Sequence, residues 1–252
     1  MKAIQYILGA TVILYSCSPR QSGSDGRHTA ITVLVDSTDS LMVYPNEDDI
    51  LGLFDFSNDM KKAATFRYRP ITDKLLNPVI TIHIDEADVT ERQNREDYVY
   101  YREEIVSTFC NDILATFQRK QNTSNAFHEL NNSEIFLAIA DELTAISSLQ
   151  ADKKILLVYS NLAEKSNVSA YNNHFLQELK NTPDKVFKSL KGDSLIPTSL
   201  KGTQVLFIYQ SANRKDEERF LGIYEHLYKR QLEKRGAKVT LQTTSKFKSY
   251  EW

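Results

Sequence analysis

Residues 31–40 read ITVLVDSTDS, an almost continuous apolar run that ends in an aspartate followed by hydroxyl side chains. An apolar run of this kind is typical of a strand that is buried on both faces of a parallel sheet. In open α/β sheets, ligands bind at the carboxyl ends of the strands, and oxygen-bearing side chains suit hard cations. This stretch therefore predicts a central strand with a candidate cation site at its end.

Strand-like and helical segments alternate along the rest of the chain. Two strand candidates, 65–69 and 79–85, are joined by a short segment rich in turn-forming residues, which predicts an antiparallel hairpin. The span that contains Pro183 and Pro197 is expected to be less ordered. Apolar runs and helical spacing predict the other elements, which are strands at 154–160, 205–209 and 238–241 and helices at 46–60, 97–118, 171–179 and 213–236, with one more from Asn131 that presents Ile135, Ile139, Leu143 and Ile146 on one face.

The order of these segments predicts an α/β fold. Repeated strand-helix-strand units imply a mostly parallel central sheet with helices on both faces. The hairpin adds an antiparallel edge strand. The expected fold class is therefore three-layer and Rossmann-like.

The composition fits an ordinary folded domain. Of the 252 residues, 41% are hydrophobic and 25% are charged, and the formal net charge is -2. No strongly basic stretch stands out, so the sequence disfavours nucleic acid as a partner.

The first residues are typical of an exported, lipid-anchored protein. Lys2 precedes an apolar segment at 4–14 that is too short for a comfortable membrane span, and residues 14–17, LYSC, resemble the lipobox of bacterial lipoproteins. Lipidation at Cys17 would place the protein on a membrane of the cell envelope. Because no acidic sorting run follows Cys17, we favour the periplasmic side. A buried first strand and a simple secretory signal are the alternatives.

This interpretation divides the chain into four parts. They are a signal with the lipidation cysteine at 1–17, a flexible tether at 18–29, one folded domain at 30–242 and a tail at 243–252.

The element order, together with Asp36, Thr38 and Ser40 after the first strand, resembles the von Willebrand factor type A domain. In that family a metal-ion-dependent adhesion site combines an Asp-x-Ser-x-Ser motif, a threonine before a middle helix and an aspartate after the next core strand. By this resemblance Ser133 takes the place of the threonine and Asn161, in the sequence YSNL, that of the aspartate. The resemblance implies a site for Mg2+ or Mn2+ that an acidic residue of a protein partner completes.

The chain departs from the family's motif at three positions. Thr38 and Ser133 keep a hydroxyl, whereas Asn161 replaces a carboxylate and removes a negative charge. Hydroxyls, an amide oxygen and one carboxylate could still hold Mg2+, but with lower affinity. In the alternative interpretation Asp36 caps a turn, Ser133 starts a helix and Asn161 supports a turn.

The resulting expectation is a membrane-tethered interaction module for an unidentified protein partner, and not an enzyme. The sequence has no phosphate-binding glycine loop, no GxSxG motif and no HExxH motif. Two alternatives stay open. The first is a metal-free structural envelope lipoprotein, and the second is an envelope hydrolase or phosphatase that uses Asp36 and a metal.

Two further features lie in the long helix at 97–118. Tyr98, Tyr100 and Tyr101 form an aromatic patch, which suits either contacts with a partner or packing at the edge of the core. Cys110 is expected to be a small core residue.

Overall fold

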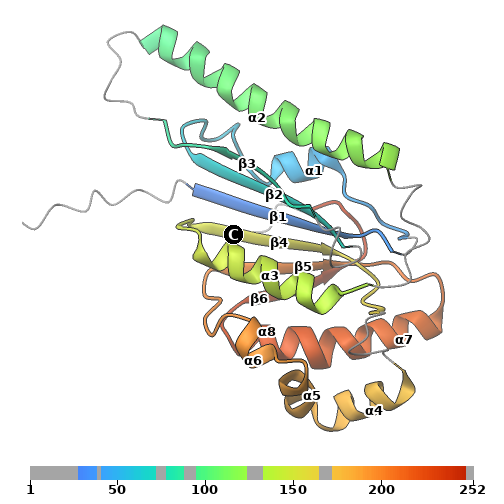
Figure 1. The fold of residues 1–252 in the computed structure, drawn as a ribbon. Helices are drawn as coiled ribbons and strands as arrows, with labels where there is room; N and C mark the ends of the chain where they lie inside the picture. Colours follow the sequence, from blue (N-terminus) through green and yellow to red (C-terminus); the bar gives the residue numbers. More distant parts are fainter. Residues whose placement is uncertain are drawn as a thin grey trace, which may run out of the picture.

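A six-stranded sheet forms the centre of the described part of the chain (Figure 1). The computed structural model describes residues 28–38, 41–71, 78–87, 95–123, 133–164 and 172–247, without the side chains of 95–98 and 119–123. In these residues the strand order is β3-β2-β1-β4-β5-β6, and β3 alone runs antiparallel to its neighbour. The strands are β1 (His28–Asp36), β2 (Ala63–Ile71), β3 (Ile80–Ile84), β4 (Lys153–Tyr159), β5 (Thr203–Ile208) and β6 (Lys238–Gln242). The predicted fold class is confirmed.

β1 is the central strand that its apolar sequence predicts. It pairs in parallel with β2 on one side and with β4 on the other. Alternate side chains of a strand point to opposite faces, and Ile31 and Val33 accordingly join one apolar core while Leu34 joins the other. The strand begins earlier than predicted, because it includes His28 and Thr29, which the sequence analysis assigned to the tether.

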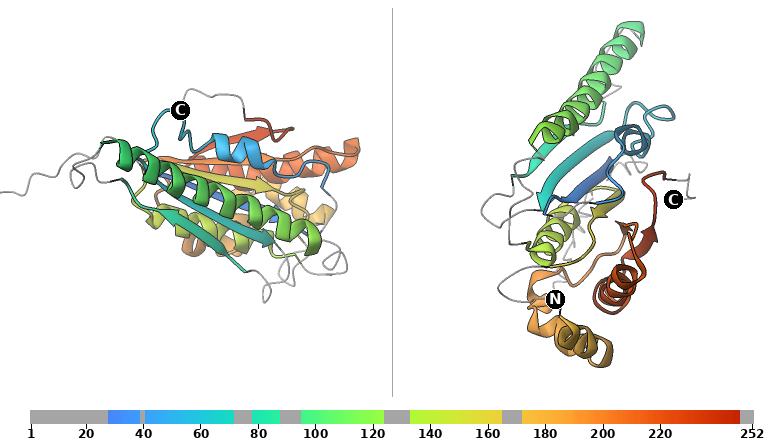
Figure 2. Two further views of the ribbon diagram at one scale, coloured as in Figure 1. Left: turned by 90° about the horizontal axis from the view of Figure 1, so that it is seen from above. Right: turned by 90° about the vertical axis from the view of Figure 1, so that its right-hand side faces the viewer.

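Helices cover both faces of the sheet (Figures 1 and 2). On one face lie α1 (Glu47–Gly52) and α2 (Arg95–Thr123). On the other lie α3 (Ile135–Ser148), α4 (Asn173–Asn181), α5 (Pro183–Ser189), α6 (Gly192–Leu195), α7 (Arg214–Ile223), the π-helical segment η3 (Tyr224–Lys229) and α8 (Arg230–Glu233). Among the described residues, no helix combines the length and the apolar character that crossing a membrane requires.

Three helical segments differ from the sequence-based prediction. α1 ends at Gly52 instead of near Met60, because the chain turns there and Asp55 adopts a left-handed conformation with φ of 56°. The span expected to be less ordered contains α5 and α6, and Pro183 stands in the first turn of α5, where a missing N–H costs nothing. The last helix is continuous in space but passes through η3 between α7 and α8.

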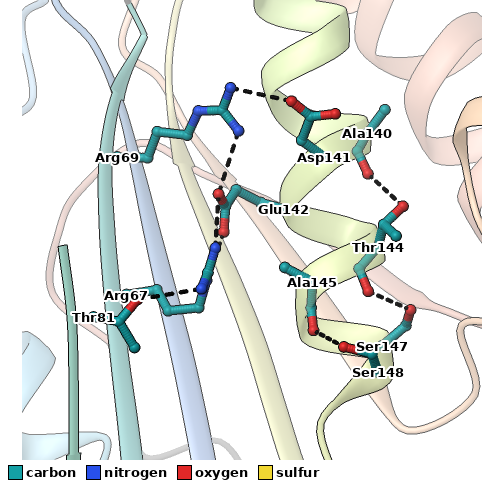
Figure 3. Close-up of polar contacts among 10 residues, drawn as sticks. All are labelled: Arg67, Arg69, Thr81, Ala140, Asp141, Glu142, Thr144, Ala145, Ser147 and Ser148. Carbon is teal, nitrogen blue, oxygen red and sulfur yellow. Dashed lines mark hydrogen bonds and ion pairs between the residues drawn. The ribbon is translucent and has the colours of Figure 1, made fainter. Parts of the chain in front are cut away.

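A buried ion network joins α3 to β2 (Figure 3). Glu142, which is only 1% exposed, accepts from Arg67 Nε at 2.9 Å and from Arg67 Nη2 at 3.2 Å. Arg69 contacts Glu142 Oε1 at 3.4 Å and Asp141 Oδ2 at 3.1 Å. Arg67 also donates to the Thr81 hydroxyl of β3 at 3.2 Å. The network fixes α3 relative to the sheet and thereby positions the first turn of α3.

Several predicted features lie outside the described residues. They are the signal with Cys17, residues 18–27 of the tether, Ser40, Asn131, the side chain of Tyr98 and the end of the tail at 248–252. The parts of the aromatic patch that are described face solvent, with Tyr100 74% and Tyr101 48% exposed. Cys110, in α2, is half-buried and packs against the core, and burial raises the pKa of its thiol.

Candidate functional site

The candidate site lies at the carboxyl edge of the sheet, between β1 and β4. From β1 the chain continues to β2 on one side, whereas β4 lies on the other side, so this is a topological switch point, where open α/β sheets bind ligands. Val35 pairs with Tyr159, which makes Asp36 and Ser160 the next residues of the two strands. Because alternate residues share a face, both belong to the face that α3 covers.

Asp36 is the centre of a buried hydrogen-bond cluster. The residue is 1% exposed, and its Oδ1 accepts from the Thr38 hydroxyl at 2.6 Å and from the Thr38 N–H at 3.1 Å. Its Oδ2 accepts from the Ser160 hydroxyl at 2.8 Å. The cluster therefore joins the loop after β1 to the end of β4 and gathers a carboxylate and two hydroxyls in one place.

The loop after β4 is held in a strained conformation next to this cluster. Leu162 is fully buried and has a positive φ of 55°, which is rare for a residue other than glycine. Its N–H donates to the Ser160 hydroxyl oxygen at 2.9 Å. Strain of this kind costs about 1–3 kcal/mol and is concentrated at functional sites. The bond to Leu162 fixes the hydroxyl that reaches Asp36.

Ser133 lies two residues before the start of α3. This helix runs back towards the start of β4, so its first turn lies at the carboxyl edge of the sheet (Figure 1). Glu164, only 6% exposed, accepts from the Phe136 N–H at 3.0 Å and so ties the loop after β4 to that turn. Ser133 is fully buried, and within the described residues its hydroxyl has no hydrogen-bond partner.

The structure brings some of the predicted site residues together. Asp36 and Thr38 are in direct contact, and Ser133 lies just before the helix that closes the same edge. Asn161 lies beside Ser160, but its Oδ1 accepts from the Ala163 N–H at 2.7 Å, as in the turn of the alternative interpretation. Its role as a metal ligand stays a prediction. Ser40 lies outside the described residues.

Two residues of the site were missed by sequence reasoning. Ser160 bonds directly to Asp36, and Glu164 places a second carboxylate at the start of α3. The strand pattern contained a signal for Ser160, because it follows the apolar run at 155–159 as Asp36 follows that at 31–35. No local pattern points to Glu164, whose contact depends on how α3 packs.

No protein-family model matches this chain, and no curated protein matches it in sequence. The resemblance to the von Willebrand factor type A domain stays a prediction from the sequence.

The chemistry of the donor set fits a hard divalent cation. The cluster offers the Asp36 carboxylate and the hydroxyls of Thr38 and Ser160, and the unpartnered Ser133 hydroxyl lies just before α3; all are oxygen donors of the kind that Mg2+ accepts together with water. In the part of the chain that the structure describes, no three His, Cys, Asp or Glu residues are grouped to hold a metal ion. A cation bound here would depend on hydroxyls for most of its protein ligands.

Tyr159, the last residue of β4, packs into the apolar core on the opposite face of the sheet. This residue is fully buried, and its hydroxyl has no hydrogen-bond partner in the described residues. Burial raises the pKa of Tyr159, and the nearby carboxylate of Asp49, in the first turn of α1, raises it further. A tyrosine is neutral at physiological pH at its ordinary pKa of about 10, and an upward shift leaves it so, which means that Tyr159 adds no charge to this edge.

Proposed function

We propose that this chain is a lipid-anchored protein of the bacterial cell envelope that faces the periplasm and binds a protein partner through the carboxyl edge of its sheet. Its folded domain would act as a von Willebrand factor type A-like module. Asp36, Thr38, Ser133 and Ser160 would hold Mg2+ or Mn2+ in a degenerate adhesion site. An acidic residue of the partner would complete the shell of the ion.

The observation that carries this proposal is the Ser133 hydroxyl. A buried polar atom without a hydrogen bond costs about 1–3 kcal/mol, which a folded protein seldom retains without a reason. Ser133 comes just before α3, whose first turn is bonded to the loop after β4 through Glu164, and that loop follows the strand end where Ser160 meets Asp36. A bound cation would give the Ser133 hydroxyl a partner.

The way in which the site would work follows from its charge. Asp36 is the only carboxylate among the proposed ligands and balances half of the charge of a divalent cation, whereas Glu164 is bonded to the first turn of α3 and Asn161 supplies an amide where the family has a second carboxylate. The ion would therefore be bound weakly by this chain alone and more tightly once a carboxylate from outside joined it. The partner's acidic residue would thus decide whether the complex forms.

A serine substitution tests the proposal. In the full-length protein in detergent, Mg2+ or Mn2+ is expected to raise the temperature of thermal unfolding, and a cation at 100 times its Kd adds about 2.7 kcal/mol of stability. Ser133→Ala is expected to weaken cation binding about tenfold or more, because it removes a ligand. Without cation, the same variant is expected to be as stable as the wild type or more stable, since it removes an unpartnered hydroxyl.

Ser148→Ala is the matched control for this experiment. Ser148 lies at the other end of α3, is exposed, and bonds only to the Ala145 carbonyl of its own helix among the described contacts. The response to cation should be unchanged in this variant. If millimolar Mg2+ and Mn2+ leave the unfolding temperature of the wild type unchanged, the proposed metal site is wrong. The second candidate function then applies. This is a metal-free structural envelope lipoprotein, which the turn formed by Asn161 favours.

The anchor is tested separately by Cys17→Ala. This variant is expected to move from the membrane fraction to the soluble fraction of lysed cells, because acyl chains contribute about 0.8 kcal/mol per buried methylene. Fractionation followed by immunoblotting measures the effect. Cys110→Ala is the control, since Cys110 lies in α2 against the core, and it should stay with the membranes. Membrane association that survives Cys17→Ala would contradict lipid anchoring.

A further inference from the structure

A groove of about 310 Å³ runs between β3 and α2, away from the site at Asp36. Its floor is apolar, with Ile82 and Ile84 from β3 and Ile105 and Phe109 from α2. The exposed ring of Tyr101 stands at one end. α2 lies along β3 in the views of Figures 1 and 2.

β3 is an edge strand of the described sheet, where it pairs only with β2. An edge strand presents N–H and C=O groups that a further strand can pair with. β3 also has the side-chain alternation of a half-covered strand, since Ile80, Ile82 and Ile84 face α2 while Thr81 and His83 are exposed. An extended peptide added here would direct every second side chain into the groove.

The charge of the groove is acidic. Glu104 and Asp112 line it from α2, with Thr108 between them, His83 lines it from β3, and no Lys or Arg is among its described lining residues. Glu104 and Asp112 are eight residues apart, which corresponds to about 12 Å along a helix. In an extended strand, side chains four residues apart point the same way and lie about 13 Å from each other. Two basic residues at that spacing would match the two carboxylates.

A second copy of this chain is a poorer occupant of the groove. In a symmetric pairing of two β3 strands, the acidic side chains of Glu104 and Asp112 would approach those of the other copy. Like charges brought together in an interface cost free energy and select against that pairing. The charge thus favours a partner of opposite sign.

We propose that this groove is a second binding surface, which takes an extended peptide segment of the pattern basic-x-apolar-x-basic as an added strand beside β3. The central apolar side chain packs between Ile82 or Ile84 and Ile105. The two basic side chains reach Glu104 and Asp112. This surface is independent of the site around Asp36 and needs no metal.

Peptides of defined sequence test the added strand. Fluorescence anisotropy with the full-length protein in detergent compares a peptide centred on Lys-Ser-Val-Ser-Lys with a shuffled peptide centred on Lys-Lys-Val-Ser-Ser and with a version in which Glu replaces Lys. We expect the first peptide to bind at least about tenfold more tightly than the other two. A version N-methylated at alternate amides lacks the N–H groups for pairing and should lose binding as well. On binding, amide hydrogen exchange of residues 80–84 should slow.

Charge variants locate the peptide. Glu104→Gln combined with Asp112→Asn is expected to weaken binding about tenfold, and its circular dichroism and thermal unfolding establish that it is folded. The control combines Glu217→Gln with Glu218→Gln, two exposed residues of α7, and should bind as the wild type does.

Three results would overturn the proposal. They are equal binding of all the peptides, binding that the charge variants leave intact, and undiminished binding of the N-methylated peptide. A dimer in sedimentation experiments that the double variant at Glu104 and Asp112 dissociates would identify a second copy as the occupant and would overturn it too.

Discussion

Glu142→Ala is expected to lower the free energy of unfolding by about 3–5 kcal/mol, because it leaves the Arg67 guanidinium partly buried without its main counter-charge. Glu142 is 1% exposed and accepts two hydrogen bonds from Arg67, at 2.9 Å and 3.2 Å. The Arg67 side chain keeps 21% exposure, which places the expected cost in the lower half of that range. Urea denaturation followed by circular dichroism measures it.

The neighbouring residue provides the control. Asp141 pairs with Arg69 at 3.1 Å, but its side chain is 57% exposed, and Asp141→Ala should cost about 0.2–1 kcal/mol. Combining Glu142→Leu with Arg67→Met should recover part of the loss, since a buried ion pair can be replaced by apolar groups of similar volume. Equal costs for Glu142→Ala and Asp141→Ala would contradict the central place of Glu142 in the network.

Asp36→Asn is expected to abolish the stabilisation by Mg2+ and Mn2+ that the proposed function requires. The substitution keeps the size of the side chain but removes the carboxylate charge of the cluster. An Asn amide nitrogen also cannot accept the hydrogen bond that Asp36 Oδ2 receives from Ser160 at 2.8 Å. Isothermal titration calorimetry with Mn2+ measures the effect. A protein that is crosslinked to the wild type in intact cells should no longer be crosslinked to this variant.

Asp152→Asn is the matched control for Asp36→Asn. Asp152 lies at the opposite end of the β1–β4 pair, where its Oδ2 accepts from the His28 N–H at 3.0 Å. Titration of this variant should reproduce the wild-type affinity. Cation binding that persists in Asp36→Asn would move the metal away from the carboxyl edge and contradict the assignment of this site.

The parts of the fold that the sequence predicted are those with a local signal. The buried strands are apolar runs, the hairpin has a short turn-rich connection, and Asn213 caps α7 through a bond from the Asp216 N–H at 3.0 Å. The ion network had no such signal. Arg67 and Glu142 are 75 residues apart in the chain, and only the packing of α3 on the sheet brings them together.

The candidate site likewise has residues that a local pattern predicted and residues that only the packing of the chain brings together. Asp36 was predicted because a charged residue that ends an apolar strand is a local pattern. The family's motif drew attention to Asn161, whereas the preceding residue, Ser160, carries the hydroxyl that faces Asp36. Which of two neighbours points to which face depends on the pairing register of β1 and β4, and a single sequence does not state that register.

The path of β1 through the domain gives the molecule a polarity. The chain enters this strand at His28 and leaves it at Asp36, and nine residues of extended chain span about 30 Å. If residue 17 carries acyl chains, the lipid anchor joins the domain at the His28 end of β1, and the Asp36 cluster lies at the other end of that strand. A partner would then approach the domain from the side remote from the bilayer.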